Sequence, residues 1–78
     1  MTKYVFYTTQ GCHLCEQAWE IVIDQGLVSS ITQVEIIHKE ADVARYGIRI
    51  PVIKNNETDK EIGWPFDGAE LANFIAQN

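Results

Sequence analysis

The sequence predicts an α/β fold with element order βαβαββα, in which three helices flank a four-stranded mixed sheet of spatial order 2-1-3-4. Two β-favouring runs separated by an amphipathic helical pattern indicate a right-handed parallel βαβ unit. After a second helical pattern, two short strands joined by a polar turn indicate antiparallel pairing. A third helical pattern then ends the chain, and this order with helices on both faces satisfies the connection rules.

Length and composition fit one domain spanning residues 1–78, because 46% apolar residues are too many for a disordered segment. The net charge is -5 and no basic cluster exists, so we expect neither nucleic acid nor an anionic membrane as a partner. No apolar run approaches the ~20 residues of a membrane span, and no secretory pattern follows Met1. Two cysteines this close together form no stapling framework. We therefore expect a cytoplasmic protein, and a monomer.

The first strand is expected at residues 3–8, where an unbroken apolar run at residues 4–7 is typical of a strand buried on both faces. A loop at residues 8–11 leads to a helix from Leu14 to about Gln25, which Gly26 is expected to end. The predicted apolar face of this helix comprises Leu14, Ala18, Ile21, Val22 and Gln25, with Trp19 and Ile23 located beside it.

The second strand is expected at residues 31–37, followed by His38 as a solvated loop residue. A short helix is expected at residues 40–46, with Gly47 as a left-handed stop. The residues of this helix that are available for packing are Val43, Ala44 and Tyr46.

The third strand is expected at residues 48–53 and contains Pro51, which cannot donate to a strand ladder. This is acceptable if the Ile50–Pro51 peptide bond is cis and the strand begins there. A polar turn at residues 55–59 precedes a short fourth strand at residues 60–63, antiparallel to the third.

The last helix carries a clear start signal. Asp67 is a good N-cap, and Glu70 three residues later completes a capping box. Phe66 and Leu71 are placed to form a hydrophobic staple across this start. Leu71, Phe74 and Ile75 then give a narrow apolar stripe, so we expect this helix to have a structural role and not a catalytic one.

The stretch Gly11-Cys12-His13-Leu14-Cys15 lies where the first strand passes into the first helix. Free N–H groups at a helix N-terminus stabilise negative charge, so we expect the thiolate form to be favoured there. The thiolate is the nucleophile in thiol–disulfide exchange. Cys12, nearer the helix start and preceded by Gly11, is the expected attacking sulfur, and Cys15, one turn inside, the resolving one.

Two other interpretations of the cysteines stay open. They form a buried pair without chemistry, or Cys12, His13, Cys15 and His38 supply ligands to a metal. A structural zinc site normally draws its ligands from two separated knuckles, and this chain has one. We therefore expect no bound metal and no cofactor. His13 either favours the Cys12 thiolate when protonated or is an exposed first-turn residue with little effect.

Three stretches in this order and spacing resemble the thioredoxin superfamily, and specifically its glutaredoxin-like small redoxins, over nearly the whole chain. They are residues 7–15, 45–52 and 62–67. The resemblance implies a thioredoxin-like fold and a thiol–disulfide oxidoreductase acting on protein or low-molecular-weight disulfides. It also implies that Pro51 is cis beside the cysteines and that the Ile50 backbone pairs with the bound substrate. Gly11 and His13 complete the candidate substrate-binding residues.

The implied partners are a disulfide-containing protein and, as electron donor, a reductase or glutathione. Thr9 replaces the lysine usual in glutathione-using glutaredoxins, and Trp64 and Phe66 replace a glycine and a small polar residue. The resulting Gly-aromatic-x-x-Asp pattern is similar to that of the redoxins that serve ribonucleotide reductase. We therefore expect poor use of glutathione. The alternative function is a non-catalytic thiol or metal-binding module on the same fold.

Overall fold

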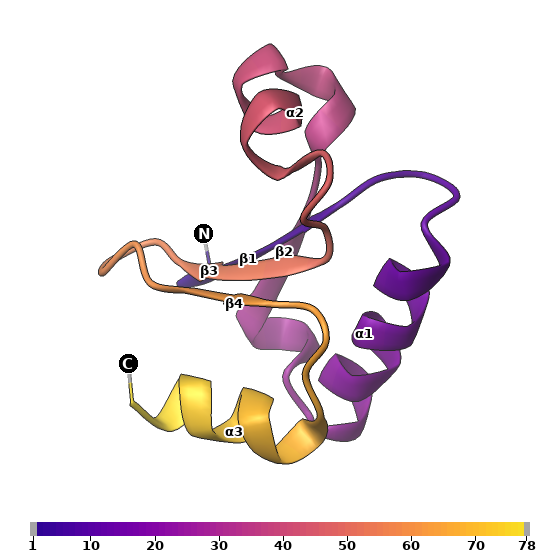
Figure 1. Cartoon of the computed structure of the whole chain (residues 1–78). Helices are drawn as coiled ribbons and strands as arrows, with labels where there is room; N and C mark the ends of the chain where they lie inside the picture. Colours follow the sequence, from indigo (N-terminus) through magenta and orange to yellow (C-terminus); the bar gives the residue numbers. More distant parts are fainter. Residues whose placement is uncertain (1, 78) are drawn as a thin grey trace.

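The structure, a computed structural model, describes residues 2–77 and consists of a sheet between two layers of helices (Figure 1). Helix α2 (Glu40–Tyr46) covers one face, whereas α1 (His13–Asp24) and α3 (Gly68–Ala76) cover the other. The strands are β1 (Tyr4–Thr8), β2 (Ile31–Glu35), β3 (Val52–Asn55) and β4 (Glu61–Gly63), and η1 (Val28–Ser30) and η2 (Ile36–His38) are short 3₁₀ helices. The predicted thioredoxin-like α/β fold with order βαβαββα is confirmed.

The strand order β2-β1-β3-β4 is also the predicted one. Strand β1 runs parallel to β2, and it pairs antiparallel with β3, with Tyr7 opposite Val52. Strands β3 and β4 are antiparallel, with Ile53 opposite Ile62. The antiparallel pairing places the end of β1 and the start of β3 at the same edge of the sheet, which is where the cysteine loop leaves β1.

Strand β1 is buried on both faces, as its apolar run predicted. Its alternate side chains enter two different cores, because successive residues of a strand point to opposite faces. Tyr4 and Phe6 join the core beneath α1 and α3, which includes Val22 and Leu71. The other face of β1 joins a smaller core with α2, made of Val5, Tyr7, Ile36, Tyr46 and Val52.

Strands β2 and β3 are shorter than predicted. The ladder with β1 ends at the pair Thr8–Glu35, so β2 has no partner beyond Glu35 and the chain turns into η2. Strand β3 begins at Val52 instead of residue 48. The N–H groups of Arg49 and Ile50 both donate to the carbonyl of Tyr46, which keeps these residues in the turn that ends α2. Ile48 is fully exposed.

The predicted apolar face of α1 was partly wrong. The buried stripe is Cys15, Ala18 and Val22, whereas Leu14 is 46% exposed. Leu14 precedes Cys15 by one residue, which turns its side chain by about 100° around the helix and away from the sheet. Gln25, also predicted on this face, is exposed.

Helix α2 also differs in detail from its prediction. Only Tyr46 is buried, and Val43 and Ala44 are exposed because this short helix covers the sheet with its C-terminal end. Gly47 is not left-handed, since its φ is -51°. A Cβ at Gly47 would lie 2.6 Å from the Val43 carbonyl oxygen, so lack of space is the reason for glycine there.

The start of α3 confirms the capping box: the Asp67 carboxylate accepts the N–H of Glu70, and the Glu70 carboxylate accepts the N–H of Asp67. The staple residues Phe66 and Leu71 are buried in one core. The Ile50–Pro51 bond is cis, as predicted, and Trp64–Pro65 is a second cis bond that was not predicted. Within residues 2–77, no helix is long and apolar enough to cross a bilayer.

Leu71 provides a test of the core beneath α1 and α3, because it is 0% exposed. The substitution Leu71→Ala removes buried methyl groups and leaves a cavity, so it should lower the free energy of unfolding by about 2–5 kcal/mol. Chemical denaturation measures this loss. Ile23→Ala is the matched control on a 51% exposed helical position, and an equal loss at both positions would contradict this packing.

Candidate functional site

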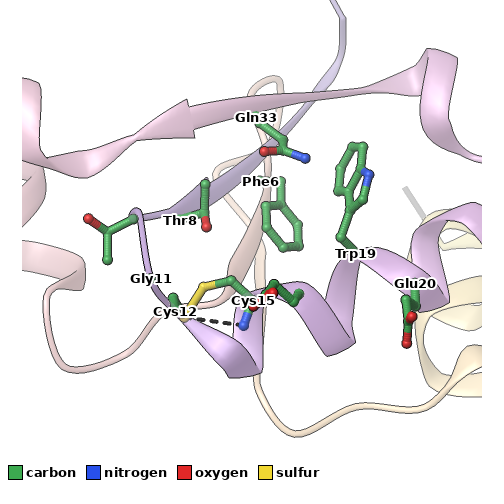
Figure 2. A pocket seen from close by; sticks show the side chains of 10 residues that line it. Phe6, Thr8, Gly11, Cys12, Cys15, Trp19, Glu20 and Gln33 are labelled. Carbon is green, nitrogen blue, oxygen red and sulfur yellow. Dashed lines mark hydrogen bonds between the residues drawn. A yellow bond between two sulfur atoms is a disulfide. The ribbon is translucent and has the colours of Figure 1, made fainter.

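The two cysteines lie at the N-terminal end of α1 and form a disulfide, with their Cα atoms 5.2 Å apart (Figure 2). Cys12 is the N-cap residue and is half-buried, whereas Cys15 lies in the first turn and is 4% exposed. The two cysteine residues therefore differ in exposure in the direction that the sequence predicted.

One backbone N–H of the first helical turn points at the Cys12 sulfur. The N–H of Cys15 donates to Cys12 Sγ over 3.2 Å, and Cys12 N–H itself donates to the Thr9 carbonyl over 3.3 Å. Gly11 has a φ of +81°, a left-handed conformation that strains any other residue. The loop thus presents Cys12 at the helix end, where N–H groups and the helix dipole favour negative charge.

The side chain of His13 lies on the surface of α1, beside Glu16. Its side chain is 90% exposed, and its Nδ1 lies 3.3 Å from a carboxylate oxygen of Glu16. An exposed pair of this kind contributes little to stability. Of the two interpretations of His13, this placement favours the exposed first-turn residue.

Pro51 and Ile50 lie at the same sheet edge as the cysteine loop, since Val52 pairs with Tyr7. The Pro51 carbonyl accepts the N–H of Trp64 over 3.2 Å. Cys12, Ile50 and Trp64 are all partly buried against the core beneath α1 and α3. The pairing of β1 with β3 therefore brings the two predicted site stretches, residues 11–15 and 50–51, to the same end of the sheet, and Trp64 adjoins the second of them.

A hydrogen-bond network behind Pro51 was not predicted. The Glu61 carboxylate accepts the Tyr46 hydroxyl over 2.8 Å and Arg49 Nη2 over 2.5 Å. The Tyr46 ring stacks on Tyr7 with centroids 4.1 Å apart, and the Arg49 guanidinium lies 5.3 Å from the Tyr46 ring centroid. The network fixes the turn that leads into Pro51. No local sequence pattern reveals it, because Glu61 lies in β4, whereas Tyr46 ends α2 and Arg49 lies in the turn after it.

The charges of this network depend on one another. Burial opposes ionisation of Glu61, but the hydrogen bonds from Arg49 and Tyr46 together outweigh it and lower the pKa of the Glu61 carboxyl. Burial and the bond to Glu61 raise the pKa of Tyr46. Tyr46 therefore remains a neutral donor to an ionised carboxylate.

Glu35 ties the cysteine loop to the end of β2, which was also not predicted. Its carboxylate accepts the N–H of Ile37 over 3.0 Å and the N–H of Gln10 over 2.9 Å. The bond from Ile37 is the main cause that lowers the pKa of Glu35, with contributions from Thr9 and Gln10. The sequence placed Glu35 inside a strand, so its role at the strand end was hidden.

A pocket of about 330 Å³ adjoins the disulfide on the β2 side (Figure 2). Trp19, predicted as a packing residue, forms one wall and packs edge-on against Phe6, with ring centroids 5.1 Å apart. The complete lining is Phe6, Thr8, Thr9, Gly11, Cys12, Cys15, Glu16, Trp19, Glu20 and Gln33. A neighbouring hollow shares Thr8, Thr9 and Gln33 and is also lined by Glu35 and by His38, which is exposed as predicted.

The possible metal ligands do not come together. Among residues 2–77, no group of three or more His, Cys, Asp or Glu side chains is placed to hold a metal ion. His38 ends η2 and lines the neighbouring hollow, whereas Cys12 and Cys15 line the pocket at the start of α1. The four residues considered as ligands therefore form no site in this conformation.

Comparison with known proteins gives a consistent result. A family profile described as Glutaredoxin-like domain (DUF836) matches residues 3–76. The X-ray structure of target protein XcR50 from X. campestris is 31% identical and has a TM-score of 0.84, covering 96% of this chain and 97% of that chain. Its solution structure is 30% identical, with a TM-score of 0.84 and coverage of 99% and 96%. No curated protein matches.

The Glu61 network predicts a pH-dependent contribution to stability. Because the folded pKa lies below the ordinary 4.5, this contribution is present above pH 4.5 and is lost as the pH falls through the lowered pKa. Glu61→Gln should reduce the free energy of unfolding by about 1–2 kcal/mol at pH 7. Thermal unfolding of both proteins should be measured between about pH 7 and pH 3. The difference in stability between them should shrink as the pH falls and the Glu61 carboxyl becomes protonated. A difference that is constant with pH would contradict the ionic role of Glu61.

Proposed function

Because the chain belongs to the glutaredoxin-like domain family, we propose that it is a small thiol–disulfide oxidoreductase in which Cys12 attacks and Cys15 resolves. One observation carries the proposal: the Cys12–Cys15 disulfide lies at a helix N-terminus, and Cys12 is the more exposed of the two residues. The family match supports a redox protein of this kind.

The proposed reaction begins from the reduced dithiol. The Cys12 thiolate attacks one sulfur of a substrate disulfide, that disulfide breaks, and the second substrate sulfur leaves as a thiolate. The Cys15 thiolate then attacks the Cys12 sulfur of the mixed disulfide. The Cys12–Cys15 disulfide forms, the bond from Cys12 to the substrate breaks, and the first substrate sulfur leaves as a thiolate. Two electrons pass to the substrate, and a thiol reductant must return them. The N–H of Cys15, which reaches Cys12 Sγ, stabilises the attacking thiolate.

Ile50 is the proposed backbone contact for the substrate. Its N–H already donates to the Tyr46 carbonyl over 3.0 Å, so a substrate N–H would pair with the Ile50 carbonyl. Such strand-like pairing uses main-chain groups and tolerates different substrate side chains. The substrate class we propose is a disulfide-containing protein, in the cytoplasm, where a working dithiol is kept reduced.

We propose a reductase of the thioredoxin reductase class as the electron donor in preference to glutathione. The Trp64 indole packs edge-on against Phe66 with ring centroids 5.2 Å apart, and the Trp64 backbone is bonded to Pro51. A glutathione backbone needs close approach there, which glycine allows and an indole hinders. A net charge of -5 does not attract an anionic tripeptide.

The roles of the two cysteines are tested by substitution. Cys12→Ser should abolish reduction of a disulfide protein such as insulin, because the nucleophile is lost. Cys15→Ser should instead accumulate a mixed disulfide through Cys12, since the resolving thiol is lost. Mass spectrometry of the trapped species identifies the linked cysteine. Trapping through Cys15 in the Cys12→Ser protein, with none in the converse variant, would reverse the assignment.

The choice of reductant is tested by coupled assays with glutathione and glutathione reductase, or with NADPH and thioredoxin reductase. The unmodified protein should turn over faster with the second pair. Trp64→Gly combined with Thr9→Lys should raise the glutathione-coupled rate by about tenfold, the effect of ~1.4 kcal/mol on a barrier. Thr9→Lys alone is the control for charge. Efficient, saturable turnover of the unmodified protein with glutathione would show that Trp64 does not block the tripeptide.

A further inference from the structure

The pocket beside the disulfide lies on the side opposite to the predicted substrate contact at Ile50. Its walls come from β1, β2 and α1, and none of its lining residues belongs to β3 or to the turn before Pro51. Strand β1 separates β2 from β3 in the sheet. A substrate segment that reaches Cys12 past Ile50 therefore has a second, separate surface on the other side of the sulfur.

The base of this pocket is aromatic. Phe6 is 1% exposed, and Trp19 is half-buried and stands on α1 beside Gln33 of β2 (Figure 2). The edge-on contact between Phe6 and Trp19 leaves the two rings at 73° to each other. An alkyl stem can pack on such rings while its polar end remains in water. A guanidinium or ammonium group near the indole also gains a cation–π contact.

The charges around the pocket have one sign. Glu16 and Glu20 stand one turn apart on α1, and no lysine or arginine is among the lining residues. Glu35 adds negative charge from the neighbouring hollow, although its carboxylate already accepts two backbone N–H groups. His13 lies beside Glu16 and carries a positive charge only when protonated. The pocket is therefore electrostatically complementary to a cation.

We propose that this pocket binds an arginine or lysine side chain located next to the reactive cysteine of the substrate protein. The stem of the basic side chain lies against Trp19, and its charge faces Glu16 and Glu20. The proposal rests on the proposed function and adds a sequence preference to it: basic residues beside the substrate disulfide increase the rate of attack by Cys12.

The test uses the reduced Cys15→Ser protein and disulfide-linked homodimers of one short peptide, with Arg, Lys, Gln or Glu beside its cysteine. Cys12 attacks one peptide sulfur, the peptide disulfide breaks, and the other peptide leaves as a thiolate. Mass spectrometry of quenched samples gives the rate constant. The Arg and Lys peptides should react about threefold to tenfold faster than the Gln peptide, and the Glu peptide slower.

Two double variants separate the pocket from the overall charge. Glu16→Gln with Glu20→Gln should reduce the ratio of the Arg rate to the Gln rate toward one. Asp24→Asn with Glu40→Gln removes two negative charges that do not line the pocket, and it should keep the ratio. A ratio that survives the first pair, or that falls equally in both pairs, would overturn the proposal.

A binding measurement tests whether the pocket holds a basic side chain, independently of the thiol–disulfide exchange reaction. The oxidised protein is titrated with the Arg peptide in which serine replaces cysteine, and the indole N–H signals of the two tryptophans are followed by NMR. The Trp19 signal should shift more with the Arg peptide than with the Gln peptide, whereas any shift of Trp64, which lies next to the proposed main-chain contact, should be the same with both peptides. A shift of Trp64 alone, or no difference between the peptides, would overturn the proposal. If Cys12 reacts with no peptide disulfide, the proposed function fails, and the titration still decides whether the pocket binds a basic side chain.

Discussion

The antiparallel pairing of β1 with β3 is the constraint on which the site depends. It places Tyr7, which precedes the cysteine loop, opposite Val52, which follows the cis proline. Strand β1 is buried on both faces, so a slip of one residue would exchange the side chains of its two cores. Its register is therefore strongly fixed. The positions of the cysteine loop and of Pro51 are fixed with it, because each is attached directly to one of the paired strands.

Two carboxylates extend this control to the loops around the site. Glu35 holds the backbone of the cysteine loop to the end of β2, and Glu61 holds Tyr46 and Arg49 on the proline side. A chain of this size has only a small core with which to fix its loops. Charge-assisted hydrogen bonds are stronger than neutral ones, so a few of them order the segments that the core does not reach.

The two sides of the disulfide offer different kinds of contact. On the β3 side, the contact in the proposed function is the main chain of Ile50, next to Pro51, whose carbonyl accepts the N–H of Trp64. On the β2 side, the pocket with Trp19 and an acidic rim presents side chains. In the proposed function, the first side accepts any extended segment, whereas the second distinguishes substrates by charge. General reduction and substrate preference would then reside on separate surfaces around one sulfur.

The sequence alone determined the element order, the cysteine pair at a helix start and the capping box at Asp67, whereas the cis bond before Pro51 was expected from the family resemblance. The first three depend on residues close together in the chain, through periodicity and capping. Only the tertiary structure decided where β2 and β3 end, that Leu14 faces solvent, and the bonds of Glu35 and Glu61. These features depend on partners from other strands and loops. Local patterns do not contain them, because strand pairing alone brings those partners together.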